Sequence, residues 1–458
     1  MKKEINKNKK QINNDPIVVK CVDFTFDGQG LCKDSNNRVY FVPSLLIDEE
    51  AEIEVLYHKK DFEVGKIKKI LKFSPFRIKP LCNCSTACGG CSFQNLLYEK
   101  ELEYKKKTAL KTLTQIGHVK VSNSTIIGMD DPTYYRNKIQ VPYGYDKQKR
   151  LVYGFYKMKS HDIIPITECV IEDKAHVSIL KDIKILMESM KIAPYNEDID
   201  KGIIRHILLR VGKVSKEIML VIVTREKNFP SKSNFIKEIK KLHPEITTIV
   251  QNINERKTNV ILGEKEEVLY GKGFIYDSLL GINFKISSKS FYQVNHDQCE
   301  KLYSLALSKA ALTKEDEIVD LYCGIGTISL IASKYVKNVI GVEIVKEAII
   351  DAKNNAKLNN INNANFICDD ASNFLMKKAY DCVFIDPPRK GLDSKVIKAL
   401  MNSHPKKIVY ISCDVGTLAR DLDLLKKNYD VKSIDFVDMF PRTYHVETVA
   451  LLEIKKSH

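Results

Sequence analysis

Short apolar segments alternate with helical stretches through the last third of the chain, and this alternation limits the fold more than any other feature of the sequence. Five segments have the composition of buried strands: EIVDLYC (317–323), NVIGVEI (338–344), ANFICDD (364–370), YDCVFIDPP (380–388) and KIVYISC (407–413). Strands that alternate with helices are typical of a mostly parallel, doubly wound sheet. We therefore predict an α/β fold in which residues 286–458 form such a Rossmann-like sheet.

A glycine-containing loop follows the first of these strands, in EIVDLYCGIGTISL (317–330). Gly324 and Gly326 would let the backbone approach a ligand closely, and a helix that starts near Thr327 would offer free N–H groups. Glu343 ends the next strand, about where an acid would bind ribose hydroxyls. The loop lacks the third spaced glycine of a dinucleotide fingerprint, and no phosphate-binding lysine follows it. The pattern therefore favours S-adenosylmethionine over NAD.

Two later strand ends carry residues that could take part in a reaction. IDPPRKGL (385–392) ends the fourth strand, and Cys413 ends the fifth. Ligands of open α/β sheets collect at the carboxyl ends of the strands, which makes Asp386 a candidate for contacting the cofactor or a target base. A free cysteine is most often a small buried apolar residue, but Cys413 stands at the mouth of the sheet, and cysteine is intrinsically very nucleophilic. We interpret Cys413 as a candidate nucleophile, whose thiolate fraction would rise beside an arginine or a helix N-terminus.

The chain closes with FPRTYHVETVALLEI (440–454), in which VETVALLEI predicts a last strand. Glu447 lies at the entrance of that strand and could accept a proton if it were partly desolvated. A solvated carboxylate at a strand end is the alternative. We interpret His445, taken alone, as structural.

The first part of the chain has a different pattern. Residues 1–15 form a Lys- and Asn-rich tail that we expect to be disordered, and residues 16–76 contain short alternating runs separated by turn signals. Four or five short strands of this kind predict a small antiparallel barrel. The formal net charge of +15 suits a polyanion such as RNA. A compositional bias toward lysine explains part of the excess, so charge alone does not choose between RNA and DNA.

The sequence contains no membrane or secretion signal that we can identify. No run approaches the ~18 apolar residues of a membrane-spanning helix, and the start MKKEINKNKK leads into no apolar stretch. We therefore expect a cytoplasmic protein without a membrane partner. Its 12 cysteines are then expected to be thiols, since disulfides are rare in that compartment.

A cysteine-rich loop, LCNCSTACGGC, contains Cys82, Cys84, Cys88 and Cys91. Metal binding is the leading interpretation, with zinc and an iron–sulfur cluster as alternatives. The positions of Cys84, Cys88 and Cys91 also match the triad of radical S-adenosylmethionine enzymes. A doubly wound sheet with its own cofactor loop argues against radical chemistry.

Basic residues are interleaved with aromatic residues in the central segment, in YYRNKIQ (134–140), GFY (154–156) and IIRHILLR (203–210). This composition suits base stacking and phosphate contacts. A buried sheet with arginines at its edge is the alternative.

Five short motifs carry a resemblance to a known family: SFYQVN (290–295), DLYCGIGT (320–327), DPPRKGL (386–392), SCD (412–414) and HVETVALL (445–452). Together they closely resemble the RNA uracil-5-methyltransferases, specifically the iron–sulfur type that acts on 23S ribosomal RNA. The match covers nearly the whole chain from about residue 16 onward. The N-terminal barrel resembles a TRAM domain, an RNA-binding fold of the oligonucleotide/oligosaccharide-binding (OB) type.

The resemblance implies roles for individual residues. Cys413 would be the nucleophile and Glu447 the general base. S-adenosylmethionine would be bound by Gln293, Tyr322, Thr327, Glu343, Asp370 and Asp386. A [4Fe-4S] cluster would be held by Cys82, Cys88, Cys91 and Cys169, with Cys84 as a competing ligand.

The resemblance also implies a division of the chain. A basic tail (1–15) and a TRAM barrel (16–76) would precede a small mixed α+β iron–sulfur domain (77–285) and the catalytic domain (286–458). A helix over 93–117 would be available to pack on the catalytic domain.

The expected function is methylation of uracil C5 in 23S rRNA, which yields 5-methyluridine. Uracil C5 is a poor nucleophile, so Cys413 would add to C6, and Glu447 would remove the C5 proton before the thiolate leaves. RNA cytosine-5-methyltransferases carry a Pro-Cys in the fourth-strand motif, which DPPR (386–389) lacks. The alternatives are a tRNA uracil-5-methyltransferase and a non-catalytic RNA-binding factor of ribosome assembly. We expect a monomer that binds RNA and not DNA.

Overall fold

The computed structural model describes residues 17–157, 160–258, 260–375 and 379–456. The chain forms two compact units. One comprises the described residues up to Glu103 together with Arg442–Tyr444, and the other comprises Tyr104–Pro441 and the residues from His445 onward. Within these described ranges, no helix has the length and apolar character needed to cross a membrane.

The first unit contains a closed barrel of five strands, which confirms the barrel predicted over 16–76. The strands are β1 (Ile17–Phe24), β2 (Gly30–Lys33), β3 (Val39–Val42), β4 (Glu50–His58) and β5 (Glu63–Lys72), in the order β1-β2-β3-β5-β4. Alternate side chains face inward, as in β1, where Val19 and Cys21 are buried between exposed neighbours. The pairing of β3 with β5 is parallel, so the prediction of a wholly antiparallel barrel is wrong at this pair. The tail predicted over 1–15 lies outside the described residues.

The second unit begins with a mixed sheet of seven strands in the order β13-β12-β11-β10-β7-β8-β9. These strands are β7 (Lys138–Tyr145), β8 (Leu151–Tyr156), β9 (Ile163–Pro165), β10 (Ile204–Val211), β11 (Ile218–Thr224), β12 (Ile246–Ile253) and β13 (Lys265–Tyr270). Helices α2 (Lys174–Ser189) and α3 (Lys232–Leu242) share one apolar core with this sheet. The hairpin β14 (Phe274–Leu279) and β15 (Ile282–Ser287) follows it in the chain.

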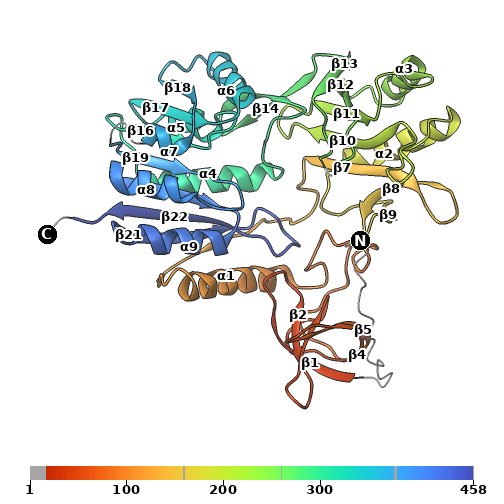
Figure 1. The fold of residues 1–458 in the computed structure, drawn as a ribbon, viewed down its shortest axis with the longest axis horizontal. Coiled ribbons are helices and arrows are strands. Elements are labelled where there is room, and N and C mark those ends of the chain that lie inside the picture. The colour runs from red at the N-terminus through yellow and green to blue at the C-terminus, as the bar shows by residue number, and fades with distance from the viewer. Residues whose placement is uncertain (1–16, 158–159, 259, 376–378, 457–458) are drawn as a thin grey trace, which may run out of the picture. The chain divides into compact units, whose positions relative to one another are not determined.

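The doubly wound sheet has eight strands in the order β18-β17-β16-β19-β20-β22-β21-β6 (Figure 1). The first five strands of this order are parallel and coincide with the five predicted segments. The strand order reverses between β16 and β19, the kind of position at which open α/β sheets bind ligands. The strands are β6 (Ile126–Ile127), β16 (Glu317–Leu321), β17 (Asn338–Glu343), β18 (Ala364–Cys368), β19 (Cys382–Ile385), β20 (Lys407–Ser412), β21 (Tyr429–Val437) and β22 (Glu447–Ile454).

Helices cover both faces of this sheet, which is why its parallel strands are continuously apolar. Phe384 of β19 belongs to the apolar layer that contains Leu302 of α4, whereas the preceding Val383 belongs to the layer that contains Leu400 of α8. The helices are α1 (Tyr98–Gln115), α4 (His296–Ala310), α5 (Thr327–Ala332), α6 (Lys346–Leu358), α7 (Ala371–Leu375), α8 (Ser394–Ser403) and α9 (Val415–Leu425).

Two elements differ from the sequence-based expectations. β6 lies in the region assigned to the iron–sulfur domain, yet Ile126 pairs with Phe436 of β21 in the catalytic sheet. A strand of two residues has no periodicity that the sequence could reveal. Helix α1 starts at Tyr98, later than predicted, because hydrogen bonds hold Asn95 outside the helix. The Asn95 side chain donates to the backbone oxygen of Ser44, and the backbone oxygen of Asn95 accepts from Ile78 N–H.

A buried ion pair joins α1 to the turn between β21 and β22. The Lys105 ammonium lies 2.7 Å from Asp438 Oδ1, and both side chains are fully buried. Lys105 also donates to the backbone oxygen of Phe440 at 3.3 Å, and Gln298 donates to the backbone oxygen of Asp438 at 3.0 Å. These contacts fix the segment that leads into β22.

We expect Lys105→Met to destabilise the protein by about 3–5 kcal/mol, because Asp438 would remain buried without its counter-ion. The double variant Lys105→Met/Asp438→Asn removes that uncompensated charge and should recover most of the loss. Urea unfolding followed by circular dichroism measures both. The exposed pair Lys100–Glu103 on the same helix is the control, and Lys100→Met should cost less than about 1 kcal/mol. Equal losses from the two lysine substitutions would contradict the role of the buried pair.

Candidate active site

The strand pair β20 and β22 brings two candidate reactive side chains together. The pair is antiparallel, with Ser412 opposite Thr448. Cys413 follows Ser412 and Glu447 precedes Thr448, so both stand at this end of the ladder, and both line one cavity. Helix α9 begins at Val415, two residues after Cys413, and the Asp414 side chain caps it by accepting a hydrogen bond from Thr417 N–H at 2.9 Å.

A cavity of about 770 Å³ opens where β16, β17, β19 and β20 end. This volume is within the range of small-molecule and cofactor sites. The structure brings all eight of the residues predicted for catalysis and cofactor binding to its lining. They are Gln293, Tyr322, Thr327, Glu343, Asp370, Asp386, Cys413 and Glu447.

The glycine loop leaves room for a ligand at one position and packs tightly at the other. Gly324 has φ +53°, and a Cβ placed there would meet no atom within 4 Å. Gly326 has φ +84°, and a Cβ there would lie 2.8 Å from the Phe366 ring. Gly324 N–H donates to Glu343 Oε2 at 3.3 Å, which holds the acid beside the loop. The cradle at Gly324 and the acid next to it suit an adenosine-containing cofactor.

Asp320, at the base of this loop, is a cavity-lining acid that the sequence analysis did not single out. One carboxylate oxygen accepts hydrogen bonds from the N–H and hydroxyl of Ser329, at 2.9 and 2.6 Å. The other oxygen is buried and has no partner among the described residues. Burial raises the pKa of Asp320 to about 7. An orphaned acceptor of this kind fits a ligand that carries an ammonium group, as S-adenosylmethionine does.

The reactive groups titrate far from their ordinary ranges. Burial raises the pKa of Asp386 to about 7. Burial, and then the charge of Asp386, raises the pKa of Glu447 to about 8, while Arg389 acts in the opposite direction. Burial, together with Glu447 and Asp386, raises the pKa of the Cys413 thiol to about 11, again opposed by Arg389. Arg389 acts in the direction expected of a nearby arginine, but burial and the two acids outweigh it, so the net pKa of Cys413 is raised.

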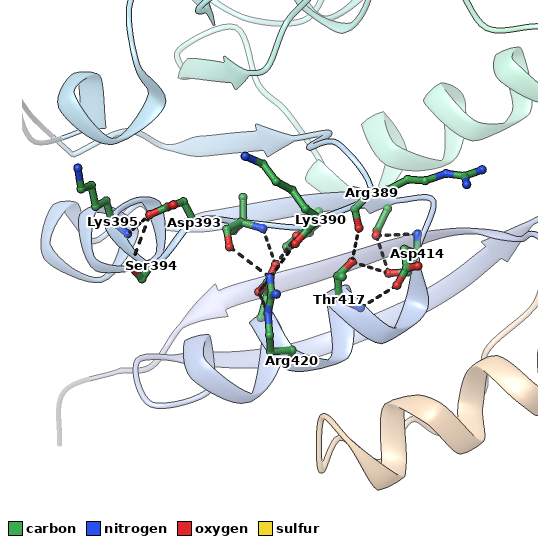
Figure 2. Close-up of polar contacts among 12 residues, drawn as sticks. Arg389, Lys390, Asp393, Ser394, Lys395, Asp414, Thr417 and Arg420 are labelled. Carbon is green, nitrogen blue, oxygen red and sulfur yellow. Dashed lines mark hydrogen bonds and ion pairs between the residues drawn. The ribbon is translucent and has the colours of Figure 1, made fainter. Parts of the chain in front are cut away.

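Arg389 is a cavity-lining residue to which the sequence analysis gave no role. Its guanidinium Nη2 donates to His445 Nε2 at 3.4 Å, and burial keeps the pKa of that histidine lowered to about 4. Figure 2 shows Arg389 and Lys390 extending from the loop in different directions, while the loop backbone is held from α9. Thr417 donates to the Arg389 oxygen at 3.2 Å, and Arg420 donates to the Lys390 oxygen at 3.1 Å. A cation directly after Asp386-Pro-Pro was the available signal for this residue.

Phe291, in the SFYQVN motif, also lines the cavity and was not assigned a role from the sequence. Its side chain is 71% exposed, which is unusual for a phenylalanine and leaves its ring free to stack on a planar group. The motif itself was visible, but exposure cannot be inferred from it.

The predicted cluster ligands are free thiols, which suits iron–sulfur chemistry. Cys82, Cys88 and Cys91 lie in the first unit, where Gln94 Nε2 donates to Cys91 Sγ at 3.5 Å, and Cys169 is a buried residue of the second unit. Among the described residues, no group of three or more His, Cys, Asp or Glu side chains is arranged to hold a metal ion. The donor chemistry fits a cluster, but the described geometry does not support one, and the ligand set stays a prediction.

Comparisons with known proteins identify the family of this chain. A family model of tRNA (uracil-5-)-methyltransferases matches residues 97–455. An uncharacterized RNA methyltransferase of Staphylococcus aureus (strain MRSA252) is 41% identical over 450 residues, which cover 96% of this chain and 99% of the relative. Another, from Halalkalibacterium halodurans, is 41% identical over 449 residues, which cover 96% of this chain and 98% of the relative.

A solved structure extends the similarity to three dimensions. It is that of the Pyrococcus abyssi tRNA (uracil-54, C5)-methyltransferase in complex with S-adenosyl-L-homocysteine, at a TM-score of 0.77 and 30% identity. The match covers 94% of this chain and 99% of that chain. The family resemblance predicted from the sequence motifs is confirmed. The chain belongs to the tRNA (uracil-5-)-methyltransferase family and is an RNA (uracil-5-)-methyltransferase with S-adenosylmethionine as its methyl donor.

Proposed function

We propose that the enzyme methylates a uridine of 23S rRNA through a covalent adduct in which Cys413 is the nucleophile and Glu447 the general base. The observation that carries this proposal is the position of these two side chains, both at the end of the β20–β22 ladder and in one cavity with the glycine loop. Nucleophile and base must reach adjacent carbons of one ring, which this pairing allows.

The reaction needs both side chains because uracil C5 is a poor nucleophile. The Cys413 thiolate forms a bond to C6 and thereby moves an electron pair toward C5. S-adenosylmethionine supplies the methyl group as an electrophile, and we propose that Gln293, Tyr322, Thr327, Glu343, Asp370 and Asp386 hold it. Glu447 then takes the C5 proton, the C5–C6 double bond re-forms, and the bond between C6 and sulfur breaks to release the thiolate.

The charges around these groups decide when they react. Cys413 and Glu447 must each lose a proton before they act, and burial opposes both losses. Arg389 is the cation that lowers the pKa of both groups, so we propose it as the positioning charge of the site. Phe291 offers an exposed ring at the cavity on which the extruded base can stack.

The choice of 23S rRNA rests on the resemblance of the sequence motifs, together with a barrel domain and a net charge of +15. A tRNA substrate is the second candidate, and it is favoured by the name of the Pyrococcus abyssi relative. We retain the [4Fe-4S] cluster with ligands Cys82, Cys88, Cys91 and Cys169 as part of the proposal, in a structural or RNA-holding role.

Covalent trapping tests the mechanism and the substrate together. We expect the enzyme to form a stable adduct with 23S rRNA fragments that contain 5-fluorouridine and not with equivalent tRNA, because fluorine cannot leave as a proton. Cys413→Ala should form no adduct. Glu447→Gln should accumulate an adduct on unmodified RNA and lower kcat about 10²–10⁴-fold, the usual contribution of a general base.

The exposed cysteine of the same sheet, in Cys368→Ser, provides the control for thiol loss and should trap normally. An adduct that persists in Cys413→Ala would disprove the assignment of the nucleophile. If only tRNA is trapped, the substrate is tRNA and not 23S rRNA, and the covalent mechanism is still supported.

The pH profile tests the role of Arg389. We expect kcat/KM to rise with pH through the pKa of Glu447, raised to about 8, and to keep rising toward the pKa of Cys413, raised to about 11, because both groups must lose a proton before they act. Arg389→Gln removes the cation that lowers this pKa, so the rising limb should shift to higher pH. Lys390→Gln removes a neighbouring charge that does not act on Glu447 and should leave the limb in place. An equal shift in both variants would argue for a general charge effect instead.

Metal analysis tests the cluster independently of activity. Protein purified without oxygen should contain about four iron atoms per chain and show the broad visible absorption of a [4Fe-4S] cluster. Cys169→Ser should lose both signals, and Cys84→Ser should keep them. Stoichiometric zinc in a colourless protein would refute the cluster. Loss of iron in Cys84→Ser with retention of iron in Cys169→Ser would show that Cys84, and not Cys169, is the fourth ligand.

A further inference from the structure

A second cavity, of about 580 Å³, lies on the seven-stranded sheet and has no role in the proposed reaction. It is lined by the end of β7 and the turn that follows, by β9 with the residues just before it, by Arg205 and His206 of β10, and by the loop 194–198. No residue lines both this cavity and the methyl-transfer cavity. Figure 1 places β7, β8 and β9 at one end of the second unit, and β16–β19 at the other.

The wall formed by β10 contains a buried cation without a carboxylate partner. Arg205 is 6% exposed, and its Nη1 donates to the backbone oxygens of Asn254 and Arg256, at 2.9 and 2.7 Å. Its Nε has no hydrogen-bond partner among the described residues, and no described carboxylate lies within ion-pair distance. A buried charge is normally paired. Arg205 therefore leaves positive charge for an anion at this wall.

The neighbouring His206 adds a second unsatisfied group. Its Nδ1 is buried and has no partner in the described part of the chain. Burial and the charge of Arg205 lower the pKa of His206 to about 4, so the ring is neutral at physiological pH. A neutral imidazole can donate or accept a hydrogen bond, as the edge of a nucleobase requires.

Three tyrosines supply flat surfaces around this wall. The Arg205 guanidinium lies 4.5 Å from the centroid of the Tyr195 ring, and Tyr195 is fixed by its hydroxyl, which donates to Asp200 Oδ1 at 3.0 Å. Tyr145 and Tyr156 line the cavity with 58% and 43% of their side chains exposed. Exposed aromatic faces beside cations are the components of single-stranded nucleic-acid sites.

A ligand that combines a planar ring with a negative charge matches both the tyrosine faces and the buried Arg205. The lining carries charges of both signs in equal number, so Arg205 is distinguished by being buried and not by a positive surface around it. The other cations are Lys147, Arg150 and Lys157, and the acids are Asp146, Asp162, Glu197 and Asp198. Asp162 and Asp198 on the lining can accept hydrogen bonds from the amino group of a base. An acidic peptide would use the cations but not the aromatic faces, and a neutral ring would leave Arg205 uncompensated.

We propose that this cavity binds a nucleoside phosphate, supplied as an unpaired nucleotide of the RNA substrate. The inference rests on the proposed function only for the source of the nucleotide, because the chemistry of the cavity is independent of the methyl-transfer site. The sequence motifs GFY and IIRHILLR, in which aromatic and basic residues are interleaved, contribute Tyr156, Arg205 and His206 to it.

RNA binding by matched tyrosine variants tests the proposal. Tyr156→Ala should raise the Kd and the KM for RNA about tenfold, the loss of one base–aromatic stacking contact, and leave kcat unchanged. Tyr156→Phe keeps the ring and should restore binding. Tyr270→Ala is the control, since Tyr270 lies in β13 of the same sheet, is also 43% exposed and lines neither cavity. Lys157→Gln should lower the slope of log Kobs against log salt by about one.

Two further arms identify the source of the nucleotide and separate this proposal from the methyl-transfer mechanism. Calorimetry with uridine and adenosine monophosphates measures the binding of free nucleotides. If Tyr156→Ala weakens the binding of these nucleotides but not the binding of RNA, the cavity binds a free nucleotide and not a nucleotide of the RNA. Tyr156-dependent RNA binding would support the cavity even if Cys413 formed no adduct. If Tyr156→Ala and Tyr145→Ala bind RNA and nucleotides as well as Tyr270→Ala does, the proposal is wrong, whatever the outcome of trapping.

Discussion

The register between β20 and β22 is the constraint on which the proposed chemistry depends. Side chains alternate between the two faces of a sheet, so a slip of one residue would move Glu447 to the other face from Cys413. Ser412 opposite Thr448 fixes the register. The buried pair of Lys105 and Asp438 stabilises the turn before β22 and thereby limits such a slip. Lys105, which is distant from Cys413 and Glu447 in sequence, thus supports the segment that places the proposed base next to the proposed nucleophile.

The cavity at this strand end gathers acids in a place where their charges are poorly solvated. Asp320, Asp386 and Glu447 all have raised pKa values, and burial is the first cause in each case. The charges also oppose one another, since Asp386 raises the pKa of Glu447. Acids in such a site stay protonated unless a nearby cation lowers their pKa. Arg389 is the cation this chain places against Glu447 and Cys413, which makes its charge a control on both reactive groups.

Much of the fold could be predicted because buried parallel strands are long apolar runs, and their carboxyl ends meet at one edge. That edge collects Asp386, Cys413 and the glycine loop from separate motifs. The register of β22 could not be predicted, because it depends on a turn that Lys105 holds from another helix. Arg389 affects the pKa values of Cys413 and Glu447 because these groups are buried near it, and a sequence motif does not reveal burial. The interleaved tyrosines and basic residues of the central segment were visible, but not which of them meet in a cavity.

The two cavities divide chemistry from recognition. Uracil occurs throughout RNA, so a site that only recognises and methylates this base cannot select one uridine among many. Moving a base out of its stack also costs a few kcal/mol, which contacts elsewhere on the RNA must offset. Stacking of one base on an aromatic side chain contributes about 1–3 kcal/mol, which is of that size. A nucleotide held beside Tyr156 and Arg205 would therefore strengthen the binding of one RNA site over others, and it would offset the cost of base extrusion when the RNA complex forms.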